Sequence, residues 1–366
     1  MSSKVYFARL KVCENTLSKI KRLFDAAGLR DLLHEDDLTA IKLHFGERGN
    51  DSFISPVHVR QVVEKIHSAG AHPFLTDTNT LYSGGRHNSV DHLTTAIEHG
   101  FGYAVTRAPL VIADGMCGAN YREVTISGRH FDTVKIAGEI LDSPSMIVLS
   151  HFKGHELAGF GGAIKNLAMG CASIAGKMDQ HKGLHPRVNS RKCTGCGSCE
   201  NACPCSAIVL QDNLSIIDHD QCIGCGECMA VCTTDAIGFN WDRDVVPFLE
   251  MMTEYAQGAV SGKEGRVGYM NFLMNITPDC DCVPWSDNAI VPDIGILAST
   301  DPVAIDHASY DLVNRQQGIR GSKLQTNFRP GEDKFRGASE HTRGEVQFHY
   351  GEEIGLGSID YELIEI

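Results

Sequence analysis

The sequence predicts an α/β fold, with a largely parallel sheet and flanking helices, into which a small α+β module is inserted. Two observations lead to this prediction. Short apolar runs alternate with amphipathic segments that carry helix start and stop signals. A cysteine-rich block interrupts this alternation, which resumes after it. We therefore expect residues 1–185 to form the first part of an α/β domain, 186–240 the inserted module, and 241–366 the continuation of the α/β domain.

Six apolar runs are the candidate strands of the sheet. They span residues 4–8, 39–45, 73–77, 109–113, 146–150 and 293–298. Most of them are continuous, as expected for strands that are covered on both faces. Helix starts are indicated by Ser55 and Asp301, each followed by a proline, and by Asn88. Gly70 and Gly100 mark the ends of two of these helices. Strands that alternate with helices favour a parallel sheet.

Composition and charge exclude several classes of partner. With 366 residues, 42% of them hydrophobic, the chain can bury a large core. No apolar run approaches the roughly 18 residues needed to span a membrane. The formal net charge of -13 disfavours nucleic acid and anionic lipid, and it suits a basic redox partner protein. The chain has 14 cysteines and no export signal, so we expect a reducing, cytoplasmic location.

Eight cysteines form two copies of the same run, C-x2-C-x2-C-x3-C. This spacing is typical of proteins that bind two [4Fe-4S] clusters, in which the fourth cysteine of each run ligates the other cluster. The ligands assigned to the first cluster are Cys193, Cys196, Cys199 and Cys232. Those assigned to the second cluster are Cys222, Cys225, Cys228 and Cys203. The chemistry implied is one-electron transfer.

Structural zinc and disulfides are the alternatives for these cysteines. Zinc sites use two C-x2-C pairs and have no need of a third and fourth cysteine repeated in tandem. Disulfides would need an oxidising compartment. Pro204 follows the first run, whereas Thr233 follows the second, and this difference removes no ligand. Cys205 lies outside the pattern and is interpreted as a spare thiol.

A second concentration of polar chemistry follows the candidate strand at 146–150. Residues 150–182 combine a glycine-rich turn, Gly159 to Gly162, with several basic side chains. These are His151, Lys153, His155, Lys165, Lys177, His181 and Lys182. Open α/β sheets usually build their sites where strands end. The N–H groups of Gly161 and Gly162, together with the charge of Lys165, could therefore bind an anionic cofactor or a phosphate. The alternative is a tight turn with surface histidines.

Other strand ends and one cysteine pair are weaker candidates. Lys42 and His44 alternate on one strand and so point the same way, either into a site that binds a cofactor or to solvent. The segments 77–79 and 84–87 could contribute to a site that closes on an anion. Cys280 and Cys282 suit a metal or redox pair, although their spacing makes a poor disulfide. The last two candidates, Asp301 and Asp306, are interpreted as a helix cap and an exposed helix face.

Several motifs resemble a known family. They are KLHFGE at 42–47, SHFKGH at 150–155, GGAIKNLAMGC at 161–171, CDC at 280–282 and DIGILASTDPVAID at 293–306. Together they are similar to the uncharacterised iron-sulfur centre proteins that carry domain of unknown function family 362. The resemblance covers nearly the whole chain and implies an α/β domain with an inserted bacterial-type ferredoxin. It implies no particular substrate.

The segment GFGGAIKNLAMG is similar to the glycine-rich lysine loop of the nickel-dependent lactate racemase family. In that family a lysine carries a nicotinate-derived nickel cofactor and histidines flank it. The resemblance implies that Lys165 takes the place of the cofactor lysine, with His155 as an acid/base and His181 as a metal ligand. It implies a shared fold and a shared site position.

These observations favour an iron-sulfur redox protein. We expect two [4Fe-4S] clusters to pass electrons to or from a site near Lys165, where a further anionic or metal cofactor or a small-molecule substrate binds. An oxidoreductase is favoured over a plain carrier, because a carrier needs no large α/β body. The alternatives are a ferredoxin-like adaptor for a partner enzyme and a lactate-racemase-like isomerase with accessory clusters.

Overall fold

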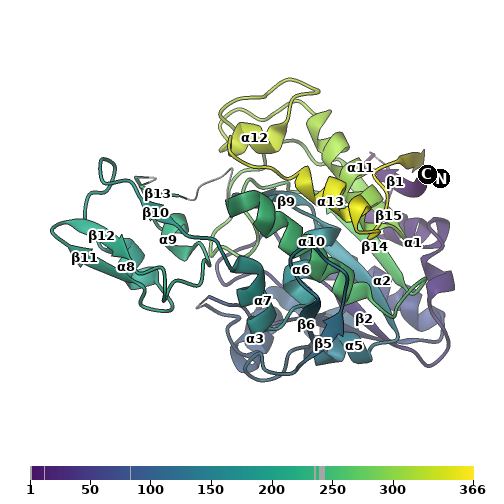
Figure 1. Cartoon of the computed structure of the whole chain (residues 1–366). Helices are drawn as coiled ribbons and strands as arrows, with labels where there is room; N and C mark the ends of the chain where they lie inside the picture. Colours follow the sequence, from purple (N-terminus) through teal and green to yellow (C-terminus); the bar gives the residue numbers. More distant parts are fainter. Residues whose placement is uncertain (1, 12, 83, 235, 239–243) are drawn as a thin grey trace.

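The computed structural model describes residues 2–11, 13–82, 84–234, 236–238 and 244–366, and its centre is an eight-stranded sheet (Figure 1). The strand order is β16-β1-β15-β14-β7-β2-β3-β4. In chain order these strands are β1 (Ser3–Arg9), β2 (Leu38–Lys42), β3 (His72–Asp77), β4 (Leu110–Ile112), β7 (Ser145–His151), β14 (Val267–Leu273), β15 (Gly295–Ser299) and β16 (Tyr361–Glu365).

The sheet is mostly parallel, which confirms the predicted fold class. Only β15 is reversed, because it pairs antiparallel with both β14 and β1. All six predicted strands lie in this sheet. Two strands escaped prediction. Gly268 and Asn271 interrupt the apolar run of β14, and Glu362 and Glu365 interrupt that of the half-exposed β16.

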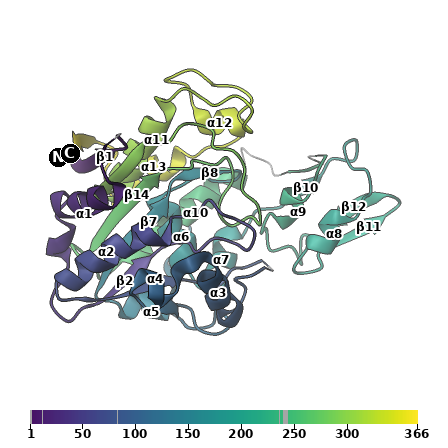
Figure 2. The same cartoon turned by 180° about the vertical axis from the view of Figure 1, so that it is seen from behind.

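Helices cover both faces of the sheet, and alternate strand residues supply two separate cores. In β7, Met146 and Val148 pack on one face while Ile147 and Leu149 pack on the other. The first face carries α6 (Ala163–Cys171), α10 (Val246–Val260), α11 (Pro302–Asn314) and α13 (Val346–Glu353). The second face carries α1 (Thr16–Ala26) and α2 (Pro56–Ser68), which lie in front in the reverse view (Figure 2).

Asp306 ties two helices of the first face together. We expected it on an exposed helix face, and this expectation is wrong, because its side chain is fully buried. Its carboxylate accepts hydrogen bonds from the N–H groups of Ala163 and Ile164, at 2.7 and 2.9 Å, and from the Asn271 amide at 2.7 Å. Asp306 therefore caps the start of α6 from α11. The expected capping role of Asp301 is confirmed, because its side chain accepts from Val303 and Ala304.

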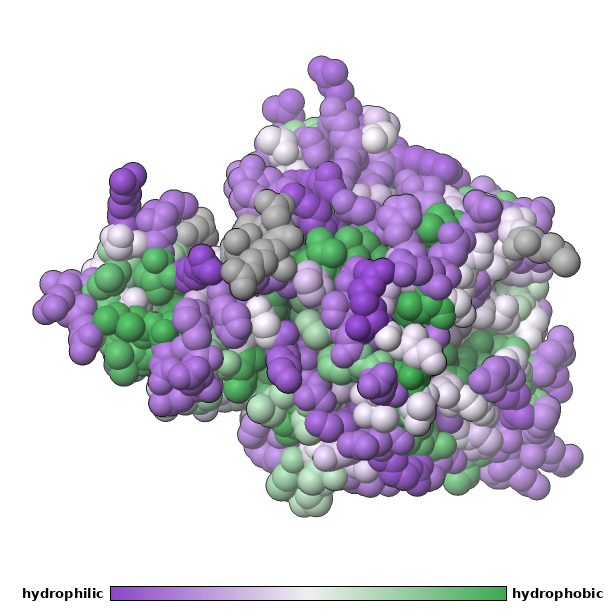
Figure 3. Space-filling view, viewed as in Figure 1, coloured by the Kyte–Doolittle hydropathy of each residue, from purple (hydrophilic) through white to green (hydrophobic). Residues whose placement is uncertain are grey.

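The cysteine-rich segment projects from the α/β body (Figure 1). It contains β10 (Arg187–Val188), α8 (Ser198–Ala202), β11 (Ile208–Gln211), β12 (Leu214–Ile217), α9 (Glu227–Ala230) and β13 (Ile237–Gly238). At its base β10 pairs antiparallel with β13. Val209 and Ile216 face each other across the β11–β12 hairpin and are 49% and 42% exposed. Figure 3 shows apolar side chains gathered on this part of the surface. The expected division into domains stays a prediction, and its boundary at 240/241 lies outside the described residues.

The remaining α-helices and strands are short, as are the helical turns η1 (Leu29–Leu32) and η2 (Ile97–Phe101). These α-helices and strands are α3 (Ser89–Ala96), α4 (Tyr103–Thr106), α5 (Gly138–Asp142), α7 (Ile174–His181), α12 (Lys334–Ala338) and the hairpins β5 (Tyr121–Thr125) with β6 (Thr133–Ala137) and β8 (Lys153–His155) with β9 (Gly159–Gly161). Within the described residues, every helix is too short or too polar to cross a membrane.

We predict that Asp306→Ala lowers the free energy of unfolding by about 3 kcal/mol or more, since it leaves three buried donors without an acceptor. Asn88→Ala is the matched control, because Asn88 caps α3 at a half-exposed position, where the cost should be about 1 kcal/mol. Urea denaturation followed by circular dichroism measures both values. Equal destabilisation by the two substitutions would contradict the role assigned to Asp306.

Candidate functional site

A cavity of about 210 Å³ opens at the carboxyl ends of β2, β3 and β7. This edge is where open α/β sheets generally bind ligands. The last residues of these strands, Lys42, Asp77 and His151, all contribute to the wall. The residues of the α/β part that we predicted to bind a cofactor or to act in catalysis also line the cavity, namely Lys42, His44, His155, Gly161, Gly162, Lys165 and His181, whereas Lys182 does not. The fold thus brings together candidates that lie far apart in the sequence.

Lys42 lines the cavity and is held by several partners, two of them side chains. Its ammonium lies 3.0 Å from the Asp77 carboxylate and donates to the Asn166 side chain at 2.6 Å. Burial has the largest effect and raises the pKa of Asp77. Lys42, followed by His44, His92 and Arg86, together outweigh burial and hold that pKa below its usual range. The approach is close, because a Cβ on Gly170 would lie 2.1 Å from the Lys42 nitrogen. Lys42 is therefore a positioned cation rather than a solvated side chain.

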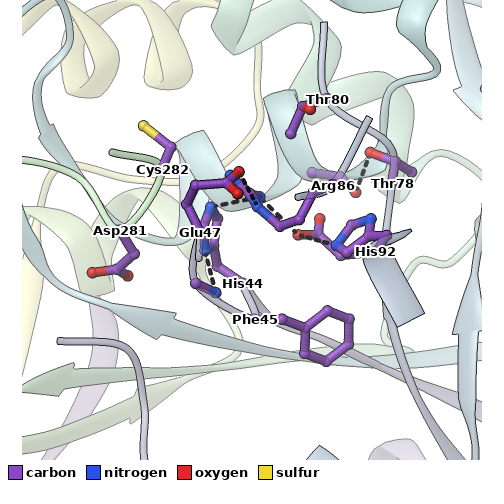
Figure 4. Close-up of polar contacts among 12 residues, drawn as sticks. His44, Phe45, Glu47, Thr78, Thr80, Arg86, His92, Asp281 and Cys282 are labelled. Carbon is purple, nitrogen blue, oxygen red and sulfur yellow. Dashed lines mark hydrogen bonds and ion pairs between the residues drawn. The ribbon is translucent and has the colours of Figure 1, made fainter. Parts of the chain in front are cut away.

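The loop at 84–87 closes on a carboxylate of the chain itself (Figure 4). The Glu47 carboxylate accepts from the Gly85 N–H at 2.7 Å and from Arg86 Nε at 3.1 Å. Arg86 also donates to His44 Nε2 at 3.0 Å. Burial first, and then the charge of Arg86, hold the pKa of His44 well below its usual range. His44 is therefore a neutral side chain beside a buried guanidinium.

The glycine-rich turn leads into α6, which carries Lys165. Gly162 allows Asp306 to approach, since a Cβ there would lie 2.3 Å from the carboxylate. Because Asp306 takes the first N–H groups of α6, the acceptor at this helix start is a residue of the chain. Lys165 lies in the first turn of α6 and lines the cavity. Its ammonium is 3.8 Å from the Cys280 sulfur.

His155 and His181 both bond the backbone through Nδ1, but they differ in the protonation of Nε2. Nδ1 of His155 accepts from the backbone N–H groups of Leu157 and Ala158, at 3.2 and 3.1 Å. In the neutral ring Nε2 then carries the proton. Nδ1 of His181 instead donates to the Lys177 carbonyl at 2.7 Å, which leaves the lone pair on Nε2. Burial lowers the pKa of His181 to about 4, so that lone pair is available at neutral pH.

Burial also lowers the pKa of Lys177, another lysine of the cavity wall, to about 8. Its ammonium donates to the Thr78 hydroxyl and to the Ala172 carbonyl, at 2.6 and 2.7 Å. Both acceptors are uncharged, so they offset the desolvation of the ammonium only in part. Lys177 therefore titrates close to neutral pH.

Cys280 and Cys282 flank Asp281 in the long connection between β14 and β15. The Asp281 carboxylate is fully buried, 2.8 Å from His151 and 3.3 Å from Lys153. The donor atoms of His155, Cys280 and Cys282 lie within 4.8 Å of one another, so this group could hold a metal ion. Sequence reasoning missed the buried role of Asp281, although its place between two cysteines was a signal.

The second cysteine run forms part of the same cavity wall, through Cys225, Gly226, Glu227 and Val231. Burial, and then repulsion by Glu156, raise the pKa of Glu227 to about 7. A small neighbouring cavity is lined by all four cysteines assigned to the second cluster and by Cys205. Cys205 lies 3.7 Å from Cys203, sulfur to sulfur. The segment at 222–232 thus lies between the expected cluster site and the cavity.

The four cysteines assigned to the first cluster have several different contact partners. Cys193 and Cys199 both approach the Ser215 hydroxyl, at 3.9 and 3.1 Å. Cys196 is exposed and lies 3.5 Å from the Ser198 hydroxyl. The Cys232 sulfur accepts from the Ala236 N–H at 3.2 Å. Ligation by either set stays a prediction.

Comparisons with known proteins place the chain in a family. No curated protein matches it. Among solved structures, the lactate racemase apoprotein from Thermoanaerobacterium thermosaccharolyticum is similar at 12% identity and a TM-score of 0.40. That match covers 74% of this chain and 51% of the other, so the chain spans about half of that protein's length. The model of the domain of unknown function DUF362 matches residues 39–311, well over half of the chain. The protein therefore belongs to the DUF362 family.

Proposed function

We propose that this protein is an iron-sulfur oxidoreductase, which binds two [4Fe-4S] clusters within 186–240 and exchanges electrons with a substrate in the cavity beside Lys165. The observation that carries the proposal is that the second cysteine run and the predicted site residues line one cavity. The residues Cys225 to Glu227 of the second cysteine run line the same cavity as Lys165 and Cys280. An electron carrier and a reaction site need such proximity to work together.

The residues present fit a four-iron cluster at the second site. Four thiols with the tandem spacing converge on one small cavity, and Gly224 and Gly226 adopt positive φ angles of 69° and 84° around it. A Cβ on Gly224 would lie 2.8 Å from the His181 carbonyl oxygen, so the loop packs directly against the cavity segment. When bound, such clusters would supply one-electron transfer.

The cavity favours a small anionic substrate or cofactor. Lys42, Arg86 and Lys153 each lie beside a carboxylate of the chain, which reduces their net field. Lys165 is half-buried at the wall and has a sulfur as its neighbour at hydrogen-bonding distance. It is therefore the cation best placed to bind an anion, and His181, whose Nε2 can accept a proton, lines the same cavity.

A second candidate function is an electron-transfer adaptor for a basic redox partner protein. The exposed pair Val209 and Ile216 favours it, since apolar side chains on a projecting hairpin suit protein contact.

A lactate-racemase-like isomerase with accessory clusters is the other candidate. The free lone pair of His181, on the helix that follows the Lys165 helix, is the feature that favours it.

We predict about eight iron and eight acid-labile sulfide per chain in anaerobically purified protein. After reduction with dithionite, electron paramagnetic resonance should show interacting reduced clusters. Stoichiometric zinc without a paramagnetic signal would overturn the proposal.

We further predict that Cys203→Ser loses about four of the eight iron atoms, because Cys203 is assigned to the second cluster. Cys205→Ser is the matched control and should keep full iron, although its sulfur lies only 3.7 Å from that of Cys203. Iron assays on both variants test the assignment. The reverse result would show that Cys205 is the ligand.

We predict that Lys165→Ala weakens binding of oxalate or inorganic phosphate at least tenfold, because it removes the half-buried ammonium at the cavity wall. Isothermal titration calorimetry measures the affinity, and iron content should be unchanged. Lys182→Ala is the control, because Lys182 is exposed and lies outside the cavity lining. Equal effects of the two substitutions would place the anion elsewhere.

A further inference from the structure

Cys280 and Cys282 lie in the wall of the cavity that the second cysteine run also lines, and they belong to neither cluster set. We propose that they form a redox-active dithiol in which Cys280 is the attacking thiolate and Cys282 the resolving thiol. The substrate class is a small anionic disulfide bound beside Lys165.

The positive group that contacts Cys280 is the Lys165 ammonium, which donates to its sulfur at 3.8 Å. The neutral His155 has a ring nitrogen within 4.8 Å of both sulfurs. The hydrogen bond from the Cys282 thiol, followed by the charges of Lys165 and Lys153, holds the pKa of Cys280 well below its usual range. The same hydrogen bond, with burial, raises the pKa of Cys282. The attacking and resolving roles follow from this asymmetry.

The protonation of His155 favours a dithiol over a metal centre. Its Nδ1 accepts two backbone N–H groups, so the proton of the neutral ring lies on Nε2. A metal-bound histidine has the opposite arrangement, since its second nitrogen normally donates. His155 is therefore suited to donate a hydrogen bond to a thiolate, and a metal would require both backbone contacts to break.

Asp281 is the positioning residue for this pair. Its carboxylate contacts His151 and Lys153 and accepts from the Ser52 hydroxyl at 3.0 Å, while its backbone carbonyl accepts from the Glu47 N–H. These contacts fix the peptide between the two thiols. A disulfide across a single intervening residue is strained, and strained disulfides are the ones that are readily reduced.

The chemistry balances as two half-reactions. The Cys280 thiolate attacks one sulfur of the substrate disulfide and expels a thiolate; Cys282 then attacks the Cys280 sulfur and expels the second thiolate, which takes the Cys282 proton. The resulting Cys280–Cys282 disulfide returns to a thiolate and a thiol by taking up two electrons and one proton. Those electrons come from the cluster module in two one-electron steps, so this half rests on the proposed function.

The test is reaction of the anaerobic, iron-loaded protein with one equivalent of 5,5'-dithiobis(2-nitrobenzoate), a small anionic disulfide. Peptide mass spectrometry should find residues 280–282 two hydrogens lighter and free of adduct. In Cys282→Ser the same reagent should remain attached to Cys280. Lys165→Met should slow the reaction about tenfold, whereas Lys182→Met should change the rate less than twofold.

Dithionite should restore both thiols in the iron-loaded protein. Cys225→Ser, which removes a residue assigned to the second cluster, should slow this recovery more than about tenfold, and Cys205→Ser should not. Full iron with an unreactive Cys280 would overturn the dithiol and leave the proposed function standing. A disulfide at 280–282 without iron would support the dithiol and overturn the proposed function. One zinc per chain that blocks reaction of both cysteines until a chelator is added would establish a metal centre instead.

Discussion

Buried positive charge at the carboxyl edge of the sheet must be compensated, and the rest of the site depends on how this is done. Lys42 lies beside Asp77, Arg86 beside Glu47, and Lys153 beside Asp281. Removing one partner of such a pair would leave an uncompensated buried charge, which is far more costly than losing a surface ion pair. The first pair joins the ends of β2 and β3, and the other two join connections that follow the strands, so all three stabilise the shape of the cavity wall.

Lys165 differs from these cations in its partner. It lies near a sulfur, so a thiolate at Cys280 completes its compensation with a group that is also reactive. The buried Asp306 carboxylate does not compensate Lys165. It accepts hydrogen bonds from the first N–H groups of α6 and from Asn271 instead. Asp306 thus fixes the start of α6, and the reactive sulfur of Cys280 lies beside Lys165 of the same helix. The second cysteine run closes the same space from the projecting segment.

The sequence predicted what is encoded locally. Continuous apolar runs located six of the eight strands, and residues at or after strand ends, such as Lys42 and His155, proved to share one cavity. Contacts between distant segments were out of reach. Asp306 looked exposed because its partners, Ala163 and Ile164, lie more than 140 residues away in the chain. The same holds for Asp281, whose pairing with His151 spans 130 positions. Asn271 hid β14 because a polar residue breaks the apolar run that strand prediction relies on.

The reversal of β15 has a consequence for how this protein can diversify. A connection between parallel strands would carry the chain from the carboxyl ends of the strands to the opposite end of the sheet, but β14 and β15 are antiparallel neighbours. The connection that carries Cys280 and Cys282 therefore leaves and re-enters the sheet at the cavity edge. Such a connection can change in length and sequence while both strands keep their register, since loops tolerate insertions better than the elements they join. Relatives with the same sheet could thus acquire different reactive groups at this position, and exchange of residues 274–294 between them is a direct route to altered chemistry.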